Sequence, residues 1–188
     1  MEALLVSTGI VALAEMGDKT QLLSLLLAAK FRRPVPIILG ILVATLANHA
    51  LAGAVGTWIT HTVGADVMRW VLGVSFLAMA AWTLIPDSAP EENTRPARFG
   101  VFGTTLITFF LIEMGDKTQI ATVALAAQYS EFYMVVAGTT IGMMLANIPA
   151  VLIGERATKA LPIRTIQVIA AVIFAVMGVV VLTGFEFG

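Results

Sequence analysis

Long apolar stretches alternate with short polar segments along this chain, and the pattern predicts six membrane-spanning helices. The apolar stretches cover residues 4–29, 35–60, 67–86, 99–127, 132–154 and 163–184. Each is long enough for a helix that crosses a bilayer, which needs roughly 20 residues. Helix-breaking prolines support these limits: Pro34 and Pro36 open the second stretch, Pro86 and Pro90 close the third, and Pro162 precedes the sixth. The sequence therefore predicts an all-α membrane protein.

The composition supports this class. Of the 188 residues, 59% are hydrophobic and only 12% are charged, whereas a soluble domain carries about 25% charged residues. The absence of cysteine excludes disulfides and thiolate ligands. The N-terminus lacks the basic start of a secretory signal, so we expect the first stretch to be a retained helix. No basic stripe or motif for nucleic acid is present.

The chain divides into two similar halves. The hydrophilic segment 87–98 separates residues 1–86 from residues 99–188, which gives one transporter domain with three spans on each side of a linker. The string Glu-Met-Gly-Asp-Lys-Thr-Gln begins at Glu15 and again at Glu113, 98 residues later. The same offset relates further pairs: Gly40 and Gly138, Ala44 and Gly142, Phe76 and Phe174, and Met79 and Met177; Asn48 and Asn147 match one residue out of step.

A repeat of three spans has an odd number of crossings, so the second half must enter the membrane inverted. Inverted repeats are typical of secondary transporters, whose substrate sites lie near the bilayer midplane between the repeats. The sequence thus predicts six transmembrane helices arranged as two inverted three-helix repeats.

Basic residues predict the orientation, because cytoplasmic loops carry an excess of Lys and Arg. On one side of a six-span arrangement lie Lys30, Arg32, Arg33, Arg95, Arg98, Arg156, Lys159 and Arg164, and on the other side lies Arg69. This bias puts the basic loops in the cytoplasm and both termini outside it.

The repeated motif predicts an ion site. Residues three and four apart share a face of a helix, so Glu15, Asp18 and Lys19 form one stripe, and their counterparts in the second half form another. Carboxylates inside a membrane are costly and mark ion or proton pathways. If the stripes face each other, their oxygen atoms suit Ca²⁺, Mg²⁺ or Mn²⁺. The expected metal-binding residues are Glu15, Asp18, Glu113, Asp116, Gln21, Gln119, Asn48 and Asn147.

Charge balance adds proton coupling. The four motif carboxylates and two motif lysines leave two negative charges uncompensated, and one divalent cation or two protons would neutralise them. Burial and like charges favour protonated carboxylates, so metal and protons should compete for the same site. The expected proton-coupling residues are Glu15, Asp18, Lys19, Glu113, Asp116 and Lys117.

The first span also predicts a helix distortion. As one helix from Leu4 to Ala29 it would be about 39 Å long, which exceeds a hydrocarbon core of about 30 Å. Gly17 and Gly115 are the natural positions for a kink, which would free backbone carbonyls as further ligands.

Simpler interpretations stay open for several residues. Glu15–Lys19 and Glu113–Lys117 are also compatible with ion pairs that only neutralise each other. The small residues Gly40 and Ala44, and their counterparts Gly138 and Gly142, favour helix packing over a site role. His49 is compatible with a proton relay or with a hydrogen-bonded interior histidine. Met16 and Met114 favour packing over a soft ligand, and the two asparagines are equally compatible with joining helices.

Among whole functions, the alternative to an exchanger is a passive divalent-cation channel. The lysines inside the acidic cluster argue against it, because fixed positive charge hinders cation flow. An enzyme is disfavoured, since no H-E-x-x-H or Gly-x-Ser-x-Gly pattern occurs. A membrane scaffold is disfavoured too, because the loops are short.

At the motifs Glu15–Thr20 and Glu113–Thr118 the chain resembles the small manganese and calcium cation/proton exchangers, the family of the Golgi manganese transporter and of bacterial manganese exporters. The resemblance covers essentially the whole chain. It implies exchange of Mn²⁺, with Ca²⁺ as the second candidate, for protons at the motif acids. It also implies export from the cytoplasm across a bacterial inner membrane. The expected partners are the metal ion, protons and lipid; no cofactor is expected, and a homo-oligomer is compatible with the sequence.

Overall fold

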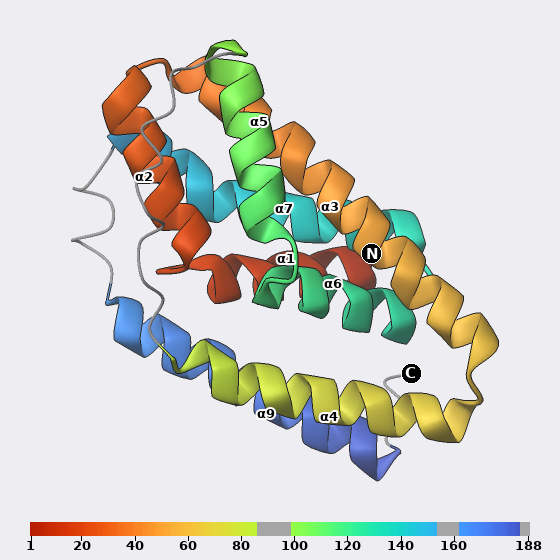
Figure 1. Cartoon of the computed structure of the whole chain (residues 1–188). Helices are drawn as coiled ribbons and strands as arrows, with labels where there is room; N and C mark the ends of the chain where they lie inside the picture. The colour runs from red at the N-terminus through yellow and green to blue at the C-terminus, as the bar shows by residue number, and fades with distance from the viewer. Residues whose placement is uncertain (86–98, 154–161, 185–188) are drawn as a thin grey trace.

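The computed structural model describes residues 1–85, 99–153 and 162–184, and all regular elements in these ranges are helices (Figure 1). The predicted all-α class is therefore confirmed. The predicted linker, Pro86, Pro90 and four of the basic residues (Arg95, Arg98, Arg156 and Lys159) lie outside the described residues. The helices are α1 (Glu2–Glu15), α2 (Lys19–Phe31), α3 (Pro34–Thr62), α4 (Ala65–Thr83), α5 (Gly100–Glu113), α6 (Lys117–Gln128), α7 (Phe132–Ile153) and α9 (Ile163–Thr183).

Three helices in the described part of the chain are long and apolar enough to cross a membrane: α3, α7 and residues Arg164–Thr183 of α9. Helix α4 covers most of the third predicted stretch. The first and fourth stretches are not single helices, because each divides into two shorter ones, α1 with α2 and α5 with α6. The count of six spans remains a prediction.

A glycine with positive φ separates the two helices in each of these stretches. Gly17 has φ 81° and Gly115 has φ 76°, a conformation that costs other residues roughly 1–2 kcal/mol because of their Cβ atom. The neighbours on both sides are extended. The predicted distortion at these glycines is confirmed, and it is a complete break rather than a kink.

The two short helices of each half pack against the long helix of the other half. Helices α1 and α2 pack on α7, whereas α5 and α6 pack on α3. A Cβ atom at Gly138 would lie 2.5 Å from the carbonyl oxygen of Leu4, and one at Gly40 would lie 2.8 Å from Cβ of Thr105. The packing interpretation of these two glycines is therefore confirmed. Because neither glycine has a side chain, α1 and α5 approach the long helices closely near their first turns.

Helices α4 and α9 pack mainly against each other and form a separate layer (Figure 1). Phe76 stacks on Phe174, with ring centroids 6.4 Å apart. These two residues occupy matching places in the halves, so this contact joins equivalent residues of the two repeats. Gly73 and Gly178 also lie at this contact, and each faces a leucine of the opposite helix.

The first helix of each half begins beside the turn between the second and third helices of the other half. The ammonium group of Met1, which precedes α1, lies 3.7 Å from the carboxylate of Glu131, between α6 and α7. A Cβ atom at Gly40, early in α3, would lie 3.0 Å from the carbonyl oxygen of Phe102, early in α5.

The break at Gly115 can be tested with a matched pair of substitutions. A Cβ atom at Gly115 or at Gly9 meets nothing within 4 Å, and only Gly115 has positive φ. We expect Gly115→Ala to lower the melting temperature in detergent, since left-handed backbone costs alanine about 1–2 kcal/mol. Gly9→Ala, in the middle of α1, should leave it unchanged or raise it. Equal melting temperatures for Gly115→Ala and wild type would contradict the proposed role of the break.

Candidate ion-binding site

The two breaks bring the four motif carboxylates together at helix ends. Glu15 and Glu113 are the last residues of α1 and α5, and Asp18 and Asp116 precede the first residues of α2 and α6. All four are at most 1% exposed. Asp18, Glu113 and Asp116 are close enough to Glu15 to interact with it electrostatically.

The two broken helices cross at their breaks. Helix α1 packs on α6, and α2 packs on α5 (Figure 1). The crossing places acidic groups from both halves of the chain in one buried cluster. A single unbroken helix could not have put Glu15 and Asp18 on the ends of two differently directed segments.

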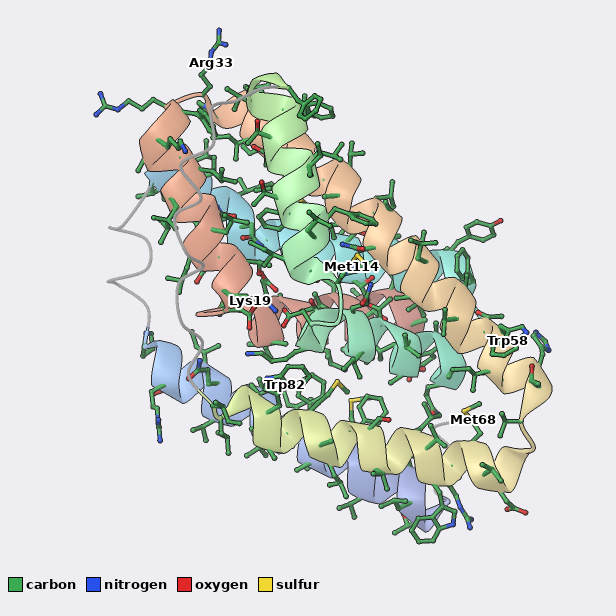
Figure 2. The ribbon with its side chains drawn as sticks, in the orientation of Figure 1. Lys19, Arg33, Trp58, Met68, Trp82 and Met114 are labelled. Atoms are coloured by element: carbon green, nitrogen blue, oxygen red, sulfur yellow. The ribbon has the colours of Figure 1, made fainter. Side chains whose placement is uncertain are left out.

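Two ion pairs link the halves at this crossing. Nζ of Lys19 lies 2.8 Å from Oδ1 of Asp116, and Nζ of Lys117 lies 2.6 Å from Oδ1 of Asp18. The alternative interpretation placed each lysine on the glutamate of its own motif, and the structure instead joins it to the aspartate of the other half. Lys19 is 28% exposed and Lys117 only 2%. In Figure 2 the labelled Lys19 lies at the start of α2, beside the end of α5 that carries Met114.

The two predicted asparagines are both buried in the cluster, but their contacts differ. Nδ2 of Asn147 lies 3.1 Å from Oε1 of Glu15, and the hydroxyl of Ser24 donates to Oδ1 of Asn147 at 2.6 Å. Nδ2 of Asn48 instead donates to the carbonyl oxygen of Phe110 at 3.0 Å. The two halves of the site are thus similar in position and unequal in chemistry.

The two predicted glutamines hold the breaks. Oε1 of Gln21 accepts a hydrogen bond from the backbone N–H of Gly17 at 2.9 Å, and Oε1 of Gln119 accepts one from Gly115 at 2.6 Å. Gln21 also donates to the carbonyl oxygen of Ala146 on α7 at 3.0 Å. Each motif therefore supplies both the glycine that breaks the helix and the glutamine that caps the exposed N–H group.

A histidine contacts one of the acids, and a methionine contacts Asn147. Nε2 of His49 lies 3.6 Å from Oε1 of Glu113, and the sulfur of Met143 lies 3.1 Å from Nδ2 of Asn147. Both ring nitrogens of His49 lack a hydrogen-bond partner among the described residues, which contradicts the interpretation of a hydrogen-bonded interior histidine. Met114, weighed as a soft ligand, is 56% exposed.

Sequence reasoning missed Met143, Ser24 and the contact of Thr118. The hydroxyl of Thr118 donates to Oε1 of Glu113. A comparison of the two halves could have drawn attention to Met143. Met143 precedes Asn147 by one helical turn, whereas Ala44 stands in the corresponding place before Asn48, so the halves differ here.

Several buried oxygens near the acids are unsatisfied. Oε2 of Glu15, Oε2 of Glu113 and Oδ1 of Asn48 make no hydrogen bond within the part of the chain that the structure describes. Such atoms are costly to bury without a partner, and they suit a cation. In the described ranges, no group of three acidic or histidine side chains is arranged to hold a metal ion. Each motif aspartate forms an ion pair with a lysine.

A cavity of about 420 Å³ lies away from this cluster. It is formed by apolar residues of α2 and of the last turn of α7, among them Leu22, Leu26 and Ile153. This hollow is therefore separate from the four acids.

Buried acids from two crossing broken helices, balanced by lysines, define the class of a membrane ion transporter. The chain matches the family described as "Divalent cation/proton antiporter GDT1" over residues 3–91 and 101–186. It belongs to this family, so the resemblance seen at the motifs is confirmed. The family is one of integral membrane transporters, whose substrates are divalent cations and protons.

Relatives agree over most of their length. The chain is 51% identical to a protein of Vibrio cholerae named "Putative manganese exporter", over 94% of this chain and 88% of that protein. It is 28% identical to "GDT1-like protein 3" of Oryza sativa, over 92% of this chain and 71% of that protein. It is 26% identical to a GDT1-like protein of Synechocystis, over 91% and 92%. No solved structure matches the chain.

The buried pair between Lys117 and Asp18 predicts strong energetic coupling. Loss of one partner breaks a buried ion pair, which costs about 3–5 kcal/mol. We expect Lys117→Met and Asp18→Asn each to destabilise the protein strongly, and the double variant to be more stable than the sum of the two losses implies. Denaturant unfolding in detergent provides the measurement. Additive losses would show that the two groups do not form a pair.

Proposed function

We propose that the protein exchanges a divalent cation for protons, with Mn²⁺ as the principal substrate and Ca²⁺ as the second candidate. The observation that carries the proposal is the crossed pairing of Lys19 with Asp116 and Lys117 with Asp18. Family membership supports the reaction class, and the name of the Vibrio cholerae relative supports the metal.

The charge balance explains why exchange suits this cluster. The four carboxylates carry four negative charges when ionised, and the two lysines return two positive charges. A buried cluster must be close to neutral, because isolated charge is expensive at low dielectric. Either one divalent cation or two protons provides that neutrality, so binding of one substrate favours loss of the other.

When no metal is bound, the ammonium groups of the two lysines neutralise the two aspartates in place of the metal. A metal ion that approaches Asp18 or Asp116 must displace an ammonium group, and the ammonium group returns when the metal leaves. We propose Glu15, Asp18, Glu113 and Asp116 as the acidic ligands, with Asn48 and Asn147 as neutral oxygen ligands. Gln21 and Gln119 shape the breaks, because their oxygens already accept backbone hydrogen bonds.

The proposed architecture is a pair of inverted repeats, residues 1–86 and 99–188, with six spans. Matching contacts support it. The first helix of each half begins beside the turn between the second and third helices of the other half, and Phe76 stacks on its counterpart Phe174. Alternating access would then consist of one repeat moving against the other around the cluster.

We further propose export of the metal from the cytoplasm across a bacterial inner membrane, with both termini outside the cytoplasm. Lys30, Arg32 and Arg33 lie at the turn between α2 and α3, whereas Arg69 lies near the start of α4, at the opposite end of α3 (Figures 1 and 2). Cytoplasmic ends of membrane helices carry the basic residues.

The orientation predicts the outcome of reporter fusions. A reporter enzyme that is active only outside the cytoplasm should be active when fused after Gly188 and inactive when inserted within residues 87–98. The matched comparison uses a fluorescent protein that folds only in the cytoplasm, which should give the reverse pattern. Activity of both reporters at the same position would contradict the six-span arrangement.

Removal of one carboxylate tests the exchange itself. In proteoliposomes with an imposed pH gradient, Asp116→Asn should lower proton-driven Mn²⁺ uptake at least about 100-fold, because it removes a metal ligand and a proton site together. Asp66→Asn, on the exposed first turn of α4, should transport normally. If Mn²⁺ uptake by the wild-type protein did not depend on the pH gradient, the result would instead favour the passive channel.

A further inference from the structure

The ring of His49 is placed where it can bind the transported ion. It is fully buried on α3, its Nε2 lies 3.6 Å from Oε1 of Glu113, and neither ring nitrogen has a hydrogen-bond partner among the described residues. A buried imidazole without a hydrogen bond is costly. The carboxylate that it approaches belongs to one of the proposed ligands, so a metal ion held by Glu113 would satisfy the imidazole as well.

Met143 occupies a similar position in the other half of the site. It is fully buried on α7, and its sulfur lies 3.1 Å from Nδ2 of Asn147. The same Nδ2 lies 3.1 Å from Oε1 of Glu15. The thioether and the carboxylate therefore flank one amide group, and a rotation of Asn147 would open both to an ion.

Neither side chain is repeated in the other half. The position that corresponds to His49 is Ile148, and the position that corresponds to Met143 is Ala44, when the asparagines are matched. The symmetric part of the cluster is made of oxygens, and the asymmetric part adds one nitrogen and one sulfur atom.

We propose that His49 and Met143 are the nitrogen and sulfur donors that select a first-row transition ion such as Mn²⁺ over Ca²⁺ and Mg²⁺. The inference rests on the proposed function and adds its selectivity. Ca²⁺ and Mg²⁺ are bound by oxygen ligands, whereas transition ions also accept imidazole and thioether groups. Selectivity is a difference between affinities, so even a weak bond to Mn²⁺ discriminates when Ca²⁺ gains nothing from it.

The test compares conservative substitutions with matched controls. His49→Gln replaces the imidazole with an amide, and Met143→Leu keeps the volume and removes the sulfur. The controls are His61→Gln, on the exposed last turn of α3, and Met114→Leu, whose side chain is exposed. Uptake of Mn²⁺ and of Ca²⁺ into proteoliposomes is measured separately for each variant that remains monodisperse in detergent.

We expect each site variant to lower the ratio of Mn²⁺ to Ca²⁺ uptake about tenfold, and the controls to keep the wild-type ratio. Equal losses for both ions, or an unchanged ratio, would overturn the inference while wild-type exchange upholds the proposed function. Wild-type protein that exchanges neither ion would overturn the proposed function instead.

A second measurement needs no transport. Pulsed electron paramagnetic resonance of Mn²⁺ bound to wild-type protein should show modulation from a directly coordinated nitrogen, and His49→Gln should lose it. Identical spectra for wild type and His49→Gln would exclude His49 as a ligand, including in a variant that has lost transport for another reason.

Discussion

The arrangement depends on the pairing of two buried aspartates with two lysines that come from opposite halves of the chain. Each half supplies an excess of acid together with one lysine, and that lysine reaches the aspartate of the partner half. Separation of the halves would break both ion pairs. Uncompensated charge is expensive in an apolar interior. The ion pairs therefore join the halves as well as hold the site.

The helix breaks follow from the same requirement. An unbroken helix would use every backbone N–H and C=O internally, and it would carry Glu15 and Asp18 along one continuous axis. With Gly17 in the left-handed region, the acids stand at the ends of two segments that run in different directions. Gln21 accepts the N–H that the break exposes, so the break leaves this donor satisfied. Close packing at Gly138 and Gly40 holds the first turns of α1 and α5 against the long helices.

Much of this was predictable because repetition and periodicity act over short distances in sequence. The duplicated motif indicated one shared site and a distortion at each motif glycine, since a shared offset implies shared geometry and only glycine adopts positive φ without strain. The partners of the lysines were not predictable in this way. Spacing allowed a pair of Glu15 with Lys19 on one unbroken helix, and only the crossing reveals that Lys19 faces Asp116. The roles of His49 and Met143 depend on contacts between α3 and α5 and within α7 beside α1, which are packing results rather than sequence patterns.

The central claim is that one divalent cation and about two protons are interchangeable at this cluster, and proton release measures it directly. Purified protein in weakly buffered detergent solution is titrated with Mn²⁺, while a pH dye reports the protons that leave. The charge balance predicts about two protons released for each Mn²⁺ bound, since binding to a neutral cluster must expel an equal charge. Binding of Mn²⁺ with no release of protons, at any pH at which the metal binds, would contradict the account.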